Sequence, residues 1–344
     1  MLSAEKSVYG RALDGCEGLS CGERNAPLYG ISLLSKVITN IAASVRQRLL
    51  NLARTRNEDF GSLLTKYALE RILYRISQSQ YQAIFVLKGA LLFELWTDQR
   101  YRPTRDADFL SNGENDPARF QAIFKEVCTI SVPDDGLVFD PEPVTAQRIK
   151  EDADYEGVRI NFLGFLERAR IPMQIDIGFG DAVTPEAVET TFPVMLNGPA
   201  PVLLTYPKET VVAEKFEAMV KLGIANSRMK DFHDLRTLGD LFAFEGEVLS
   251  DAIKRTFERR KTAIPATAPP IAFTPEFFED EAKKLQWSAF TTKNRIYVPA
   301  ISLQEVVAAV ERFVMPLIAP MGAEEQRRWS WPPGGPWVAK KTEE

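Results

Sequence analysis

Near residue 200 the spacing of the apolar residues changes along this chain, and the change restricts the folds that it can adopt. Between residues 83 and 179, short apolar segments such as 171–179 follow the period of two that is typical of strands. After about residue 205 the apolar residues follow helical spacing instead. The chain is therefore expected to be an α+β protein in which a helical part follows a core of helices and strands.

The same periodicities predict the individual elements and their boundaries. Residues 1–30 show no sustained period and are expected to form an N-terminal arm, and the proline-rich residues 263–275 indicate a linker or surface loop. The expected strands are 83–87, 105–111, 136–139, 158–165 and 171–179, and the expected helices are 38–52, 60–76, 90–96, 117–128, 208–222, 228–244, 248–261, 275–288 and 302–318. We predict a core over 31–200, a helical C-terminal domain over 201–322 and a tail over 323–344.

The charge and the rare residues exclude several classes of protein. Of 344 residues, 42 are basic and 47 acidic, so the net charge is −5 and no protein-wide positive field attracts nucleic acid. His233 is the only histidine, so Ser-His-Asp or Cys-His catalysis would have to use it. Cys16, Cys21 and Cys128 complete neither a zinc site nor a disulfide framework. We expect carboxylates, lysines and arginines to carry any catalysis, in a reduced, cytoplasmic protein.

No segment of the sequence is expected to enter a membrane. The first ten residues lack the apolar region of a signal peptide, and the most apolar stretch, residues 85–96, contains Lys88 and Glu94. We therefore expect no membrane partner.

Acidic residues on two predicted strands are the strongest candidates for a metal site. Asp106 and Asp108 lie two apart on one strand, so both side chains project from the same face and can share a divalent cation. Asp176 lies between Ile175 and Ile177 on a second strand, where an unpaired charge is costly to bury and a cation is a natural partner. The alternative for Asp106 and Asp108 is two solvated carboxylates on an edge strand.

Three further segments carry candidate phosphate-binding groups. The turn formed by Lys88, Gly89 and Ala90 joins a strand to a helix, so its backbone N–H groups can receive phosphate oxygens, although a plain tight turn is the commoner explanation. Lys215 falls near an apolar helical stripe, which favours partial burial and pairing. In a later helix the candidates are Asp231 and Asp234, three apart on one face, and Lys230, which can pair with Asp234 at i,i+4; the alternative is a surface salt-bridge ladder.

The order of these segments resembles the AbiEii/AbiGii toxin family of nucleotidyltransferases over roughly residues 37–240. The segments that carry the resemblance are NIAASVR (40–46), YALER (67–71), FVLKGA (85–90), RPTRDAD (102–108), QIDIGFG (174–180), ETVVAEK (209–215) and NSRMKDFHD (226–234). The resemblance implies a polymerase-β-like nucleotidyltransferase core, a mixed sheet with helices, followed by a helical domain. It also implies Mg²⁺ and a nucleoside triphosphate, an antitoxin partner, and tRNA as the RNA acceptor.

Roles for single residues also follow from the resemblance. Asp106 and Asp108 match the metal-binding D-x-D, and Asp176 stands where the third carboxylate is expected, as base or metal ligand. The remaining matches are Lys215, which would meet the triphosphate, Asp231 or Asp234 as the acidic residue of K-D-x-x-D with Lys230 beside it, and Lys88, Gly89 and Ala90 at the nucleotide-binding turn. Where many nucleotidyltransferases have Gly-Ser or Gly-Gly, this chain has Gly89 and Ala90, so backbone donors must suffice there.

Two other functions remain compatible with these residues. A phosphotransferase would use the same metal and triphosphate machinery, and a non-catalytic interaction protein would leave the carboxylates solvated. For an RNA acceptor, the candidate phosphate contacts are two local basic clusters, which could equally be solvated faces: Arg100, Arg102 and Arg105 beside the acidic strand, and Lys254, Arg255, Arg259, Arg260 and Lys261 on one predicted helix.

Overall fold

The computed structural model describes residues 40–97, 101–152, 155–318 and 328–340, and the part from Asn40 onward forms one compact unit. Its main sheet has seven strands in the order β3-β4-β5-β2-β1-β7-β6. The β2/β5 and β1/β7 pairs are parallel and the others are antiparallel, so the sheet is mixed, as expected for an α+β protein. The strands are β1 (Phe85–Lys88), β2 (Asp106–Ser111), β3 (Leu137–Asp152), β4 (Tyr155–Leu166), β5 (Ala169–Phe179), β6 (Val188–Thr191) and β7 (Val202–Thr205).

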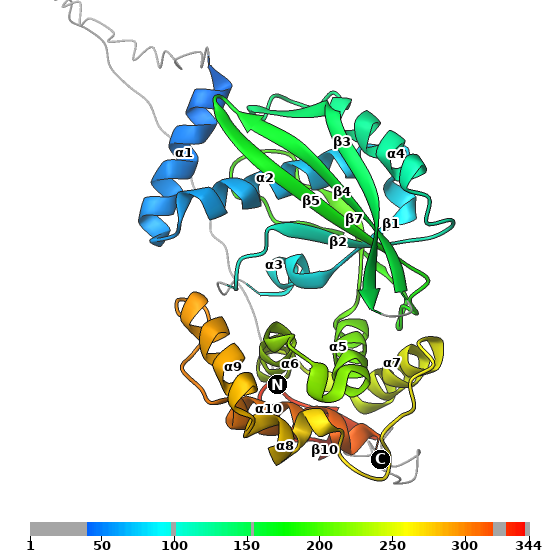
Figure 1. Cartoon of the computed structure of the whole chain (residues 1–344). Coiled ribbons are helices and arrows are strands. Elements are labelled where there is room, and N and C mark those ends of the chain that lie inside the picture. The colour runs from blue at the N-terminus through cyan, green and yellow to red at the C-terminus, as the bar shows by residue number, and fades with distance from the viewer. Residues whose placement is uncertain (1–39, 98–100, 153–154, 319–327, 341–344) are drawn as a thin grey trace, which may run out of the picture. The chain divides into compact units, whose positions relative to one another are not determined.

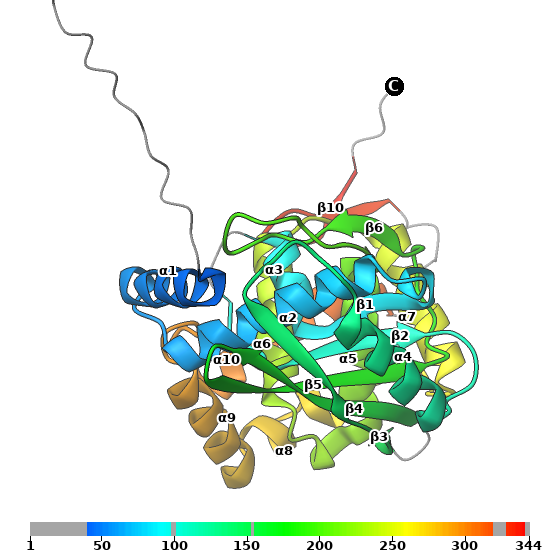
Figure 2. The same ribbon diagram turned by 90° about the horizontal axis from the view of Figure 1, so that it is seen from above.

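Four helices belong to the segment that builds this sheet: α1 (Ile41–Arg56), α2 (Phe60–Ser77), α3 (Leu92–Trp96) and α4 (Pro117–Thr129). Capping side chains explain where the three longer helices, α1, α2 and α4, begin. Asn40, Asp59 and Asp116 each accept a hydrogen bond from a backbone N–H of the first turn. Helix α2 contacts β5 and β7, and α4 contacts β3 and β4 (Figures 1 and 2). A cluster of aromatic rings, including Phe85, Phe109 and Phe124, fills the core under α4.

In the part of the chain that the structure describes, six α-helices follow β7: α5 (Lys208–Leu222), α6 (Met229–Leu241), α7 (Gly246–Arg259), α8 (Pro275–Phe278), α9 (Glu281–Lys293) and α10 (Leu303–Val314). Helix α5 packs against α6 and α7, and α10 packs against α6 (Figure 1). A small second sheet joins β8 (Phe244–Glu245), β9 (Trp329–Trp331) and β10 (Val338–Ala339). Among the residues described, no helix is both long and apolar enough to cross a membrane.

Several predicted elements differ from the observed ones. The predicted helix 275–288 is two helices, because the Asp280 side chain caps a new helix by accepting from the Lys283 N–H. The strand predicted at 136–139 continues to Asp152 through a bulge, and β6 and β7 were missed. The main sheet thus extends to Thr205. The predicted boundary near residue 200, between the core and a helical C-terminal domain, stays a prediction.

Part of the predicted tail is folded. Trp331 is buried, its ring packs 4.9 Å from that of Phe313, and its Nε1 donates to the Gly239 carbonyl at 2.7 Å. The expectation of a tail is therefore wrong for the segment around β9, because the contacts that order it come from distant parts of the chain, such as Gly239 at a separation of 92 positions.

Candidate active site

Three carboxylates meet on adjacent strands. Asp106 and Asp108 project from one face of β2. The alternate residues Ala107 and Phe109 project from the other face and are fully buried in the core. Strand β5 lies parallel to β2 with Asp176 in register with Asp108. One oxygen from each of the three carboxylates lies within 4.8 Å of the others. The geometry therefore brings together the three residues that the sequence singled out as metal ligands.

Gly89 is required for the position of Asp108. The glycine has a φ of +77°, and a Cβ built on it would lie 2.1 Å from the Asp108 Oδ2. Burial and the charge of Asp106 raise the pKa of Asp108 to about 7, although Lys88 and Lys230 act in the opposite direction. A carboxylate in this position is thus poorly compensated by the protein alone.

Asp176 has a protein cation as its partner. Arg159 on β4 donates through Nε and Nη2 to the two carboxylate oxygens at 2.8 and 2.7 Å, and Gln174 donates to one of them at 3.2 Å. The prediction that Asp176 needs a cation is met here by an arginine. Sequence reasoning missed Arg159 because its place opposite Asp176 depends on the β4/β5 register.

A cavity of about 390 Å³ opens beside the carboxylates. It contains most of the residues proposed from the sequence as nucleotide-binding or metal-binding. Its wall consists of Lys88, Gly89, Ala90, Arg102, Thr104, Asp106, Asp108, Arg159, Asp176, Tyr206, Val211, Glu214, Lys215, Arg228, Lys230 and Arg260. Lys88, Gly89, Ala90, Lys215 and Lys230 thus line one cavity with the three carboxylates, although they come from separate segments of the chain.

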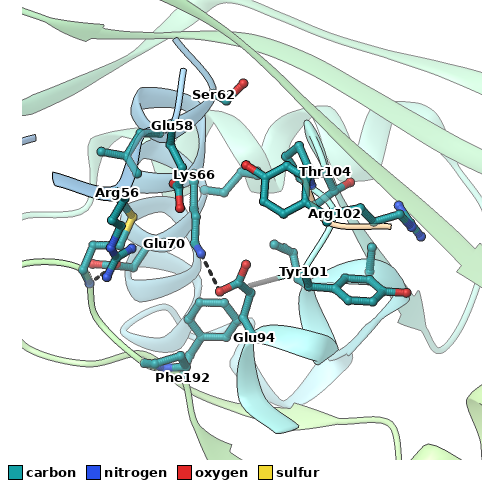
Figure 3. A pocket seen from close by; sticks show the side chains of 18 of the residues that line it. Arg56, Glu58, Ser62, Lys66, Glu70, Glu94, Tyr101, Arg102, Thr104 and Phe192 are labelled. Atoms are coloured by element: carbon teal, nitrogen blue, oxygen red, sulfur yellow. Dashed lines mark hydrogen bonds and ion pairs between the residues drawn. The ribbon is translucent and has the colours of Figure 1, made fainter. Parts of the chain in front are cut away.

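A second cavity, of about 300 Å³, lies between α2, α3 and residues 192–195 (Figure 3). It shares Ala90, Arg102 and Thr104 with the first, and an ion pair from Lys66 to Glu94, 2.5 Å long, crosses it. The three candidate metal ligands do not line it, so we place the candidate chemistry in the first cavity.

Asp231 and Asp234 lie behind the cavity wall rather than in it. Both are almost fully buried, and they bind the Lys215 ammonium at 2.5 and 2.8 Å. Asp231 also pairs with Arg228 at 2.7 Å, and Asp234 accepts a bidentate pair from Arg102 at 2.9 and 2.7 Å. The alternative of a surface salt-bridge ladder is therefore wrong for these two residues.

The consequence is a row of cations held at the cavity wall. Burial lowers the pKa of Lys215, but the charges of Asp231 and Asp234 outweigh it, so the pKa is raised and the ammonium stays charged. Lys230, expected to pair with Asp234, is instead exposed and lines the cavity, while Asp234 pairs with Lys215 and Arg102. Asp231 and Asp234 are thus placed to position Lys215, Arg102 and Arg228.

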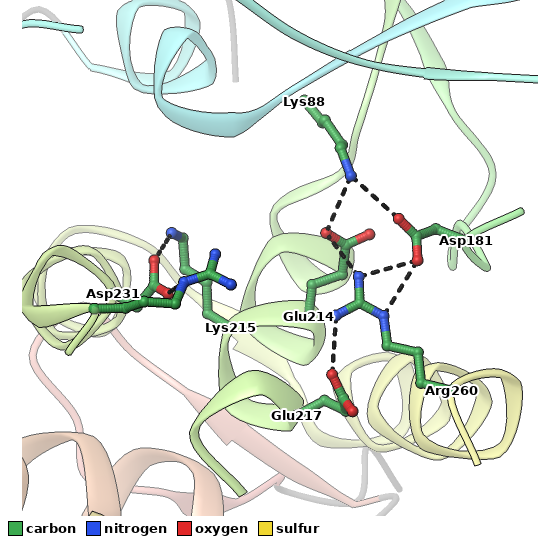
Figure 4. A network of polar contacts seen from close by, with 8 residues as sticks. Lys88, Asp181, Glu214, Lys215, Glu217, Asp231 and Arg260 are labelled. Atoms are coloured by element: carbon green, nitrogen blue, oxygen red, sulfur yellow. Dashed lines mark hydrogen bonds and ion pairs between the residues drawn. The ribbon is translucent and has the colours of Figure 1, made fainter. Parts of the chain in front are cut away.

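A second ionic network joins the sheet to the helices on the other side of the cavity (Figure 4). Lys88 lies 3.1 Å from Asp181 and 4.0 Å from Glu214, and Arg260 lies 3.0 Å from Asp181 and 2.9 Å from Glu217. Burial raises the pKa of Asp181, but Lys88 and Arg260 outweigh it and hold the value at about 2. Lys88 was predicted to belong to a phosphate-binding turn, and its ammonium is in fact shared with these carboxylates.

The residues of the two predicted basic clusters differ in exposure and in their partners. Arg100 and the cysteines Cys16 and Cys21 lie outside the described residues, and Cys128 is a free, buried thiol. Arg102 is paired with Asp234 and Arg260 belongs to the network of Figure 4, so both guanidinium charges are partly balanced within the protein, and their contact with RNA phosphates stays a prediction. The cluster members with exposed side chains are Arg105, Lys254, Arg255, Arg259 and Lys261.

Three clustered carboxylates beside a cavity walled by lysines and arginines define a site of the class that transfers phosphoryl or nucleotidyl groups. Comparison with known families agrees with this class. The family model described as "Nucleotidyl transferase AbiEii toxin, Type IV TA system" matches residues 71–311. Since the match spans well over half of the chain, the chain belongs to this family of nucleotidyltransferase toxins, which confirms the predicted family.

Two solved structures from Helicobacter pylori share low identity with the chain. A protein assigned as a nucleotidyltransferase is 14% identical, with a TM-score of 0.44, over 74% of this chain and 94% of its own. The protein JHP933 is 15% identical, with a TM-score of 0.45, over 77% of this chain and 94% of its own. A comparison with the curated proteins found no match.

Proposed function

We propose that this nucleotidyltransferase moves a nucleotide from a nucleoside triphosphate to an RNA acceptor, tRNA, with Mg²⁺ at Asp106, Asp108 and Asp176. The observation that carries the proposal is the meeting of these three carboxylates at the edge of a cation-lined cavity. As a toxin of the type IV family, the protein would be held in check by an antitoxin.

The donor set fits Mg²⁺. It consists of carboxylate oxygens alone, which are the hard ligands that this ion prefers, and they lie close enough to share it. Burial and the charge of Asp106 raise the pKa of Asp108, so the protein alone compensates this carboxylate poorly, and a divalent cation would compensate it. When bound, the ion would neutralise the triphosphate and stabilise the charge that develops on the reacting oxygens.

The protein groups around the cavity supply the remaining requirements. Lys215, Arg102, Arg228 and Lys230 would balance the charge of the triphosphate, and the Gly89 turn would offer backbone N–H groups to phosphate oxygens. An acceptor hydroxyl would form a bond to the α-phosphorus while the bond to pyrophosphate breaks. Asp176, once Arg159 releases it, would receive the proton of that hydroxyl.

The acceptor is tested directly with labelled substrates. The protein is incubated with each α-labelled nucleoside triphosphate, Mg²⁺ and total RNA, and the products are separated on a gel and weighed by mass spectrometry. We expect label in the tRNA band and a mass increase of whole nucleotides. Transfer of the γ-phosphoryl group alone, or no Mg²⁺-dependent product with any RNA, would contradict the proposal.

A further inference from the structure

The sheet face that carries the three carboxylates continues beyond them over β5, β4 and β3. Arg159 of β4 is in register with Asp176 of β5, and Gln147 of β3 is in register with Arg159. Side chains alternate between the two faces of a strand, so the same register identifies the residues that share this face towards the turn between β4 and β5. We call them, with Arg159 and Gln147, the open face: Val138, Asp140, Thr145, Asn161, Leu163, Phe165, Arg170, Pro172 and Gln174.

The two faces of these strands differ in burial. On the opposite face Phe139 and Phe162 are buried. Arg75 of α2 lies over the Phe139 ring, and the Phe162 ring lies 6.1 Å from that of Phe124 in α4. Helix α2 accordingly lies behind β5 in Figure 1. The residues of the open face are all partly or fully exposed, and Val138 is 65% exposed. The helices thus pack on one face, and the carboxylates belong to the face that forms a surface.

The chemistry of the open face changes with distance from the carboxylates. The residues nearest to them carry hydrogen-bonding groups: Thr145, Gln147, Arg159, Asn161 and Gln174. Farther along, Phe165 of β4 is in register with Arg170 of β5, so a partly exposed aromatic ring and a guanidinium lie on neighbouring strands. Amides and hydroxyls bind base edges and ribose hydroxyls, aromatic rings stack on unpaired bases, and arginines bind phosphates. These are the groups with which proteins bind single-stranded RNA.

The charge of the open face also suits a polyanion. Its two arginines, Arg159 and Arg170, stand against one carboxylate, Asp140, whose Oδ1 accepts from the Glu142 N–H. Arg159 is paired with Asp176 in this structure, and its side chain is still 35% exposed. A phosphate that reached the Arg159 guanidinium could therefore replace the carboxylate as its bidentate partner.

The position of the open face favours the acceptor over the triphosphate. Lys215 and Lys230, on α5 and α6, are among the cations proposed to meet the triphosphate. The open face begins instead at Asp176, which is proposed to receive the proton of the acceptor hydroxyl. Arg170 lies six residues from Asp176 along β5, a length of about 20 Å, so the face has room for several nucleotides.

We propose that the open face of β3, β4 and β5 binds the single-stranded end of the RNA acceptor, with Phe165 stacking on a base and Arg159 and Arg170 binding phosphates. The inference rests on the proposed function, because it places the acceptor hydroxyl at Asp176. When Arg159 turns to a phosphate of the acceptor, Asp176 is released to receive the proton. Binding of the acceptor thus completes the site at which it reacts.

Anisotropy measurements with two RNA probes test the inference. One probe is a fluorescently labelled tRNA, and the other is the same tRNA without its unpaired 3′-terminal nucleotides. For Phe165→Ala we expect the complete tRNA to bind about tenfold more weakly, a loss typical of one base stacked on an aromatic ring, and the shortened tRNA to bind as to wild type. Arg170→Gln should weaken binding of the complete tRNA alone and flatten its plot of log K against log salt by about 0.7 per lost phosphate contact.

A matched variant and a second ligand control the measurement. Phe278→Ala, on α8, changes the same type of residue at a similarly partial exposure and should leave both tRNA affinities as in wild type. Calorimetry with the Mg²⁺ complex of a nucleoside triphosphate should give equal affinities in wild type, Phe165→Ala and Arg170→Gln, because neither residue lines the cavity. Arg170 is exposed, so Arg170→Gln should keep the wild-type melting temperature and tests the face even if Phe165→Ala is less stable.

The remaining outcomes separate the possible failures. Equal affinity for the complete tRNA in wild type and both variants, or an equal loss with both probes, would overturn the inference while the proposed function stands. A change in oligomeric state by light scattering, with unchanged tRNA affinity, would assign the open face to a contact between copies of the chain and would also overturn it. If wild type transfers no nucleotide to any RNA, the proposed function itself fails.

Discussion

At the scale of single residues, the position of a candidate metal ligand depends on the space that its neighbours leave. Gly89 leaves the space that the Asp108 carboxylate occupies, and its left-handed backbone turns the chain from β1 towards α3. An alanine here would meet both the carboxylate and an unfavourable φ. A small residue with no chemistry of its own thus decides where a candidate metal ligand lies.

Asp108→Asn should separate catalysis from stability. We expect transfer to fall to background and Mn²⁺ affinity to fall by at least about tenfold, the loss caused even by outer-shell changes at metal sites. Without metal, the melting temperature should not fall, because the change removes one of three mutually repelling carboxylates. Asp251→Asn, in an exposed surface pair on α7, is the control that should keep both activity and metal binding. Wild-type turnover in Asp108→Asn would disprove the metal assignment.

His233 should act as a single-residue reporter of acid stability. Burial and the nearby Arg102 lower its pKa to about 4, although Asp234 opposes them, and its ring packs against Tyr101 and Phe290. The unfolded chain therefore binds the proton more readily, so this contribution to stability is complete above about pH 6.5 and is lost as the pH falls towards 4. The loss should be on the order of 2–3 kcal/mol by denaturant unfolding.

The chain's only histidine makes the measurement direct. Its ring proton resonance should show no titration between pH 8 and 5.5, and His233→Phe should flatten the dependence of unfolding free energy on pH over the same interval. A midpoint near 6.5 in the folded protein would contradict a buried neutral imidazole.

At the scale of elements, helix α5 serves both ionic networks. Consecutive residues of a helix point about 100° apart. Lys215 is therefore directed towards α6, where Asp231 and Asp234 hold it, while Glu214 is directed towards Lys88 and Arg260 (Figure 4). Neighbouring residues in one turn of α5 thus belong to two separate ionic networks.

The α6 carboxylates should matter to stability more than Lys215 does. Asp234 pairs with both Lys215 and Arg102, and Asp234→Asn removes the negative charge from both pairs. We therefore expect the free energy of unfolding to fall by about 3–5 kcal/mol. Lys215→Met should cost less stability, since Asp231 retains Arg228 and Asp234 retains Arg102, yet it should slow transfer by on the order of 10²- to 10³-fold. Urea unfolding and single-turnover rates measure the two effects. A stable but inactive Asp234→Asn protein would instead favour a direct catalytic role.

At the scale of the whole molecule, an acidic protein with the proposed RNA acceptor would have to bind it through local charge. The net charge of −5 repels a polyanion, and Arg260, one of the expected phosphate contacts, is committed to holding the sheet and helices together. Among the exposed basic residues of α7 and the turn after it, Arg259 donates to the Gly180 carbonyl next to β5, so Lys254, Arg255 and Lys261 are the ones that we expect RNA phosphates to meet.

The salt dependence of binding tests this surface. Changing Lys254, Arg255 and Lys261 together to Gln should preserve the fold, weaken tRNA binding and flatten the plot of log K against log salt by about 0.7–0.9 per lost phosphate contact. The same change at the exposed Lys284 and Lys293 of α9 should leave the slope as in wild type. An unchanged slope in the triple variant would remove α7 from the RNA path. Arg260→Gln, by contrast, should destabilise the protein whatever the salt.

The features of this protein that depend on local spacing follow from the sequence alone. The period of two places Asp106 and Asp108 on one face with Ala107 and Phe109 on the other, and helical spacing predicts α5 to the residue. The order of the motifs was enough to identify the family. These signals are local because the face on which a side chain lies is set by the geometry of its own element.

Which residues contact one another across the site is set by the tertiary fold. Asp176 joins Asp108 because β5 pairs in parallel with β2 from more than 60 positions away, and Arg159 reaches Asp176 through the register of β4. The burial of Asp231 and Asp234 and the engagement of Arg260 likewise depend on how helices pack, which no local period encodes. Charged residues look alike in sequence whether they are solvated or paired in a core, and only packing distinguishes the two because it sets both their solvation and their partners.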